Sequence, residues 1–82
     1  MRVFTAMQVF NRVAELKGFA AAARDLGIST SSVSRHVSDL EDELGVRLFN
    51  RTTRRLSLTD DGAEYQTRST AILQDLDDLH HS

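Results

Sequence analysis

Apolar residues recur at helical spacing in the first part of the chain. A first helix is expected from Thr5, as its N-cap, to Lys17, because the following Gly18 is a residue type that ends helices. The apolar side chains of this segment come every three positions, at Met7, Phe10, Val13 and Leu16. This spacing predicts one helical stripe that faces a core.

The next two helices are expected to be joined by a tight turn. An alanine-rich run over 20–26 predicts a short helix that stops at Gly27, since glycine adopts the left-handed conformation without a Cβ clash. Ser29 is a good N-cap for a third helix, which Gly45 terminates. The buried stripe of this third helix is expected to consist of Val33, Val37, Leu40 and Leu44.

After the third helix the helical period gives way to alternation. Leu48 and Phe49 precede a polar turn, and Leu56 and Leu58 alternate with polar neighbours. This pattern predicts a short β-hairpin. Its tip, residues 52–54, lacks the Asn-Gly signal of a two-residue turn, so we expect a longer loop.

A last helix is expected to begin after Thr59, with Asp60 and Asp61 in its first turn, where the helix dipole favours acids. Its heptad-like positions form a C-terminal stripe of Tyr65, Ser69, Ile72, Leu76 and Leu79. A domain of this size buries only about 60% of the surface of its unfolded chain. We therefore expect this stripe to meet a second copy in a homodimer. A longer chain that contains this domain is compatible with a higher oligomer.

Charge is segregated along the sequence. The 82 residues carry a net charge of −2, which by itself argues against a nucleic-acid partner. However, the segments 26–38 and 44–59 contain no acidic residue and hold five arginines, at Arg35, Arg47, Arg51, Arg54 and Arg55. The acids cluster elsewhere, over 39–43 and 75–78. The pattern predicts a local cationic surface on an acidic body.

A short helix, a glycine turn and a helix with a small polar outer face are typical of the helix-turn-helix, whose second helix enters the DNA major groove. The predicted recognition helix covers about 30–44. Its candidate base contacts are Thr30, Ser31, Ser34, Arg35 and Ser38. The adjacent hairpin would act as a wing on the backbone or in the minor groove, through Arg51, Thr52, Thr53, Arg54 and Arg55.

The segment that runs FNRVAELKGFAAAARDLGISTSSVSRHVSDLEDELGVRLFNRTTRRLSLTDDG resembles the N-terminal domain of LysR-type transcriptional regulators. Its most specific parts are the helix-turn-helix at 19–40, LEDELGVRLFNR at 40–51 and RRLSLTDDG at 54–62. The resemblance implies a mainly α winged helix-turn-helix with a three-helix core, a DNA-binding domain over 1–58 and a linker or dimerisation helix over 59–82.

Within this resemblance, Ser34, Arg35 and the wing arginines match the family pattern. Thr30 and Ser31 stand where the family commonly has Gln-Pro or Gln-Ser, and Ala20 stands where it usually has a capping Ser or Thr, which removes about 1 kcal/mol of capping. Family members normally continue into a C-terminal effector-binding domain. No part of that domain lies in these 82 residues, so we expect the chain to be a fragment of a longer regulator.

Other classes of function are disfavoured. The chain has no cysteine, its adjacent Asp77 and Asp78 point in different directions on a helix, and His80 and His81 lack metal-ligand spacing. We therefore expect no enzyme, no cofactor and no metal. The short apolar runs indicate a cytoplasmic protein without a membrane partner. The remaining alternative is a winged-helix module for protein–protein contact, since the fold alone does not dictate function.

Overall fold

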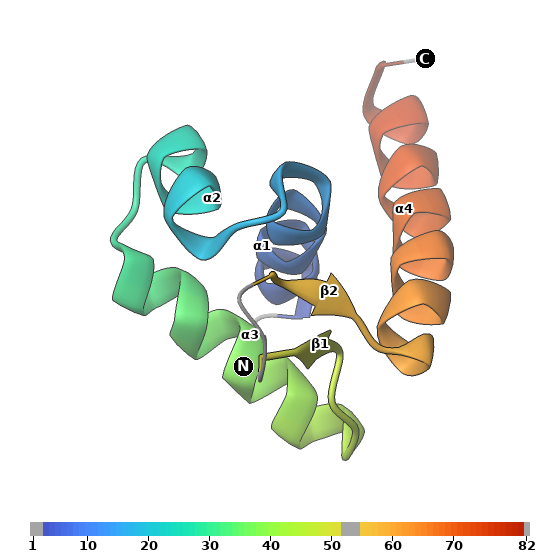
Figure 1. Ribbon diagram of the computed structural model, residues 1–82. Coiled ribbons are helices and arrows are strands. Elements are labelled where there is room, and N and C mark those ends of the chain that lie inside the picture. The colour runs from blue at the N-terminus through green and yellow to red at the C-terminus, as the bar shows by residue number, and fades with distance from the viewer. Residues whose placement is uncertain (1–2, 52–54, 82) are drawn as a thin grey trace.

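The computed structural model describes residues 3–51 and 55–81 of the chain. In this part of the chain the elements are, in order, α1 (Val3–Leu16), α2 (Phe19–Leu26), α3 (Thr30–Leu44), β1 (Phe49–Asn50), β2 (Ser57–Leu58) and α4 (Asp60–His81). The first three helices pack around one another, the antiparallel hairpin lies against them, and α4 stands on the far side of α1 from α2 (Figure 1). This architecture is the predicted winged helix-turn-helix, a three-helix core with a short hairpin and a long last helix.

The core lies between α1, α2, α3 and the hairpin. Phe10 of α1 is fully buried at its centre and contacts the rings of Phe49 in β1 and Tyr65 in α4, each with ring centroids 5.2 Å apart. Phe19, the first residue of α2, also contacts the Phe49 ring, with ring centroids 5.8 Å apart. The aromatic contacts thus join the hairpin and α4 to the helical core.

The helix ends follow the predicted chemistry in most places. Gly27 and Gly45 both take the left-handed conformation, with φ of 71°. The Ser29 hydroxyl accepts from the backbone N–H of Ser32 at the start of α3, and the Thr59 hydroxyl accepts from that of Gly62 at the start of α4. At the start of α2 the N-cap is Gly18 and no side chain caps the helix. Ala20, which is predicted to stand at the capping position, is instead the second residue of the helix, so the prediction that it replaces the cap is wrong.

Three further details of the predicted helices are wrong. Thr5 lies inside α1, which begins at Val3, so it is not the N-cap. Leu16 and Leu44 are 40% and 42% exposed, because each is the last residue of its helix and extends beyond the packed layer. In α1 the buried face is wider than predicted and includes Ala6 and Val9.

The first half of α4 is docked on its own domain. Ser69 is 1% exposed, and its hydroxyl donates to Asn11 Oδ1 of α1 at 3.1 Å. Tyr65 is half-buried against Phe10. The C-terminal stripe is therefore not uniform: Tyr65 and Ser69 pack against α1, whereas Ile72 and Leu79 are exposed and Leu76 is half-buried.

Gly62 allows the close approach that docks α4. It lies in the first turn of the helix, where an added Cβ would overlap the carbonyl oxygen of Leu48 and stand 2.9 Å from its carbonyl carbon. The same carbonyl accepts the backbone N–H of Thr59 at 3.0 Å. A residue without a side chain is therefore required at this position.

Candidate nucleic-acid interface

The turn into α3 is held by a group of serines. Besides accepting the N-cap bond at 3.1 Å, the Ser29 hydroxyl donates to the Ser32 hydroxyl at 2.9 Å and lies 3.2 Å from the Ser31 hydroxyl. These bonds fix the first turn of the helix, which leaves Thr30 exposed beside it. The N-terminal end of α3 is thus an ordered, small-residue surface.

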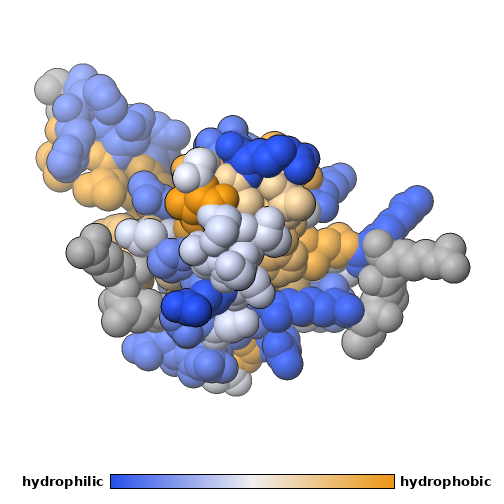
Figure 2. Space-filling model, turned by 90° about the vertical axis from the view of Figure 1, so that its left-hand side faces the viewer, coloured by the Kyte–Doolittle hydropathy of each residue, from blue (hydrophilic) through white to orange (hydrophobic). Residues whose placement is uncertain are grey.

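The predicted base-contact residues share one side of α3. Ser31 and Arg35 are exposed, and Ser34 and Ser38 are half-buried beside them. Figure 2 views the molecule from the side on which α2 and the start of α3 lie, and pale side chains of intermediate hydropathy fill its centre, with hydrophobic ones directly above and beside them and hydrophilic ones farther out. Apart from Arg35, these side chains are small, which leaves room for close approach to a flat or grooved partner.

The wing is a two-residue ladder in which Phe49 pairs with Leu58 and Asn50 with Ser57. The Asn50 amide donates to Ser57 Oγ at 3.2 Å and to the Leu58 carbonyl at 3.3 Å, which closes the end of the ladder. Residues 51–56 connect the strands, so the loop is longer than two residues, as predicted. Its tip, with Thr52, Thr53 and Arg54, lies outside the described residues.

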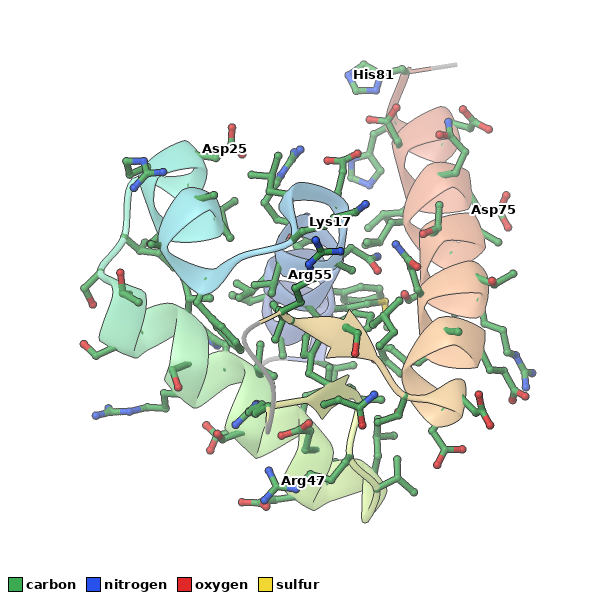
Figure 3. The ribbon with its side chains drawn as sticks, viewed as in Figure 1. Lys17, Asp25, Arg47, Arg55, Asp75 and His81 are labelled. Atoms are coloured by element: carbon green, nitrogen blue, oxygen red, sulfur yellow. The ribbon has the colours of Figure 1, made fainter. Side chains whose placement is uncertain are left out.

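Cations surround the hairpin, and acids occupy the distal half of α4. Lys17 at the end of α1 and Arg55 before β2 line the same hollow, and Figure 3 shows both side chains extending above the hairpin. Arg47 lies at the opposite end, beyond α3, while Asp75 lies well away on α4. The predicted separation thus holds for the acids at the far end of α4, whereas the acidic run over 39–43 lies beside the cations: Asp42 lines the same hollow as Arg47.

Glu41 departs from the sequence prediction. It belongs to the acidic run over 39–43, yet it is only 4% exposed. Its Oε2 accepts the backbone N–H of Leu48 at 2.8 Å and of Phe49 at 3.3 Å. Its Oε1 accepts Arg51 Nη2 at 2.9 Å and Arg47 Nη1 at 3.4 Å. The carboxylate therefore joins the last turns of α3 to the base of the wing.

Arg51 is held on two sides. Besides its ion pair with Glu41, its guanidinium carbon lies 5.4 Å from the centre of the Phe19 ring. Its side chain is 32% exposed, against 73% for Arg47. The sequence does hold one signal for the burial of Glu41: it lies four residues after Val37 and one after Leu40, so it flanks the buried stripe of α3. The helical period does not reveal its partner Arg51, which is ten residues away.

No group of three His, Cys, Asp or Glu that could hold a metal ion occurs within residues 3–51 and 55–81. No helix in the described part of the chain is long and apolar enough to cross a membrane.

Burial raises the pKa of Tyr65 above its ordinary value of 10.0.

Comparison with known proteins identifies the family. A family model described as bacterial regulatory helix-turn-helix protein, lysR family, matches residues 4–63. This match covers most of the chain, including α1 from its second residue, α2, α3, the hairpin and the start of α4. The chain belongs to the lysR family of bacterial regulatory helix-turn-helix proteins.

Curated relatives are transcriptional regulators. The chain is 49% identical over 79 residues to an HTH-type transcriptional repressor of Pseudomonas aeruginosa, a match that covers 96% of this chain and 25% of the repressor. It is 47% identical over 74 residues to the transcriptional activator AaeR of Escherichia coli, covering 90% of this chain and 24% of AaeR. The chain thus spans about a quarter of the length of these relatives.

Solved structures share the fold. A structure of the BenM DNA-binding domain in complex with catB site 1 DNA superposes with a TM-score of 0.92 at 28% identity and covers 95% of this chain and 87% of that one. The LysR-type regulator CrgA of Neisseria meningitidis gives a TM-score of 0.74 at 49% identity, covering 88% of this chain and 24% of CrgA.

Proposed function

We propose that the chain is the DNA-binding domain of a bacterial transcriptional regulator and binds double-stranded DNA sequence-specifically. The observation that carries this proposal is the outer face of α3, where small polar side chains and Arg35 lie beside an arginine-bearing wing. A domain of the same fold, that of BenM, has been solved in complex with DNA. The role is non-enzymatic, and binding to chromosomal DNA requires a cytoplasmic location.

In this proposal α3 lies in the major groove. The groove is roughly 12 Å wide and admits a helix whose leading side chains are slim, which serine and threonine are. Arg35 is long enough to reach guanine O6 and N7. The candidate base contacts are Thr30, Ser31, Ser34, Arg35 and Ser38. The wing meets phosphates or a narrow minor groove through Arg55 and the residues of its tip.

The domain is proposed to act as a homodimer through α4. Ile72 and Leu79 are 47% and 71% exposed, and Leu76 is half-buried between them in the sequence. Their spacing of four and three residues is that of a heptad stripe. Residues 1–58 then form the DNA-binding domain and residues 59–82 the linker and dimerisation helix.

Selection from a random duplex library tests the proposal. The protein is expected to enrich a pseudo-palindromic motif whose half-sites lie about 10 base pairs, or a multiple of that, apart. An insertion of about half a turn between the half-sites should then weaken binding strongly, because the two recognition helices no longer face the same side of the duplex. Failure to enrich any motif, with binding that does not distinguish sequences, would contradict the proposed function.

A further inference from the structure

We infer that Glu41, Arg51 and Phe19 form a clamp that sets the position of the wing against the recognition helix, and that Arg51 is a positioning residue of DNA binding rather than a phosphate contact. The consequence for DNA rests on the proposed function. The clamp itself rests on contacts within the chain. It assigns a role to an acidic residue that lies inside a cationic interface.

The Glu41 carboxylate connects α3 to both ends of β1. A buried carboxylate is costly unless it is paired and hydrogen-bonded. Both oxygens of Glu41 have such partners: Oε2 binds the two backbone amides at the start of the wing, those of Leu48 and Phe49, and Oε1 binds Arg51 and Arg47. Through these two hydrogen bonds from backbone N–H groups, the last turns of α3 fix the position at which β1 begins.

Arg51 fastens the other end of β1. It follows the strand directly, and its guanidinium lies between the Glu41 carboxylate and the face of the Phe19 ring. A planar guanidinium can make an ion pair at its edge and stack on a ring at the same time, which an ammonium cannot do. Since Phe19 begins α2, the clamp joins α2, α3 and the wing at one point.

The geometry argues against a phosphate contact for Arg51. A phosphate would have to draw the guanidinium away from a carboxylate that is 4% exposed. Among residues 3–51 and 55–81, the cationic partner left to Glu41 would then be Arg47, at 3.4 Å and with 73% of its side chain exposed. Removing one partner from a buried ion pair leaves an uncompensated charge, which is strongly unfavourable. Arg51 therefore stays on Glu41 when the wing meets an anionic partner.

The decisive variant is Glu41→Gln, with Glu43→Gln as its matched control. Both changes remove one acidic charge from α3 with little change in size, but Glu43 is exposed. If charge alone matters, both variants bind DNA more tightly, because a like charge to the phosphates is gone. The clamp predicts opposite signs: Glu43→Gln binds as well as the unaltered protein or better, whereas Glu41→Gln loses about tenfold on the selected duplex and little on a scrambled duplex.

Changes at Arg51 separate positioning from phosphate contact. In the clamp, Arg51→Lys keeps the charge but loses the stacked pair, so it should lose about as much affinity for the selected duplex as Arg51→Gln. Neither variant should change the log-log salt slope, whereas loss of a phosphate contact lowers it by about 0.9 per contact. An Arg51→Lys variant with full affinity, or an Arg51→Gln variant with a reduced slope, would overturn the inference.

A measurement without DNA keeps the inference testable on its own. In the free protein the NMR signals of the Arg51 guanidinium should show hindered rotation, and this hindrance should disappear in Glu41→Gln and remain in Glu43→Gln. If the signals are averaged in the unaltered protein, the clamp does not exist in solution. If the clamp signals are present but no duplex is selected, the proposed function fails and the clamp survives.

Discussion

Replacement of Gly62 by alanine should separate α4 from the domain. The added Cβ would overlap the Leu48 carbonyl oxygen and stand 2.9 Å from its carbon and 3.1 Å from Leu58 Cδ2. Because the carbonyl belongs to the backbone, no rotamer change can relieve the overlap. The start of the helix must move outwards, and the bond from the Thr59 N–H to the same carbonyl is stretched or lost.

The magnitude follows from three opposing effects. Forced overpacking costs about 1 to 3 kcal/mol, and the weakened hydrogen bond adds about 1 kcal/mol. The higher helix propensity of alanine relative to glycine stabilises the variant by about 1 kcal/mol. The net loss is therefore about 2 kcal/mol, which is a large share of the roughly 4 to 12 kcal/mol expected for a domain of 82 residues.

Thermal unfolding followed by circular dichroism measures this loss. A domain of this size shifts its Tm by about 4 to 8 °C per kcal/mol, so a loss of about 2 kcal/mol should make Gly62→Ala unfold about 8 to 16 °C lower. Gly18→Ala is the matched control, because its nearest neighbour would be Ala21 Cβ at an ordinary 3.9 Å. That variant should lose less than about 1 kcal/mol. An unchanged or higher Tm for Gly62→Ala would refute the close-approach argument.

Four further outcomes are expected. Leu76→Asp should give monomers in sedimentation, since a charge enters the exposed end of the C-terminal stripe; no change from the unaltered protein would exclude this interface. Arg35→Ala should cost about 1 to 3 kcal/mol on the selected duplex and less on random DNA, and an unchanged specificity ratio would remove this residue from base readout. Arg55→Ala should weaken binding to all duplexes and lower the salt slope by about 0.9 per contact, and an unchanged slope would contradict a phosphate role. Stability should fall as the pH rises above 10.0, because burial raises the pKa of Tyr65 and the unfolded chain releases the phenol proton first. Tyr65→Phe should flatten this alkaline loss in urea titrations, and an unaltered pH dependence would point to another group.

Local signals account for most of the fold. Gly27, Gly45, Ser29 and Thr59 act within one turn of the chain, so the end of α2, the bounds of α3 and the start of α4 could be predicted from the sequence. The N-terminus of α1 could not, because Thr5 is a residue type that caps helices but lies inside α1, which begins at Val3. The residues that precede Thr5 in the helix, Val3 and Phe4, are exposed, so packing does not account for this start.

The exposed polar residues of the candidate interface could be predicted from the sequence, but the long-range side-chain contacts beneath them could not. The outward direction of Ser31 and Arg35 follows from helix geometry alone. The burial of Glu41 and the docking of Ser69 on Asn11 do not, because each depends on a partner brought near by the fold, 58 residues away in the case of Ser69 and Asn11. Contacts of this kind leave no periodic trace in a single sequence.

The docked first half of α4 makes the rest of this helix a lever arm. The helix is held on α1 through Tyr65 and Ser69, and Leu73 and Leu76 are still half-buried. The twelve residues beyond Ser69, to His81, extend about 18 Å. A tilt of about 10° at the fixed part would carry the far end through about 3 Å. If two copies join at the exposed ends of their stripes, the angle at that joint sets the distance between their recognition helices. A force applied far from α3 could then change which half-site spacing the pair can span, with no rearrangement inside either domain.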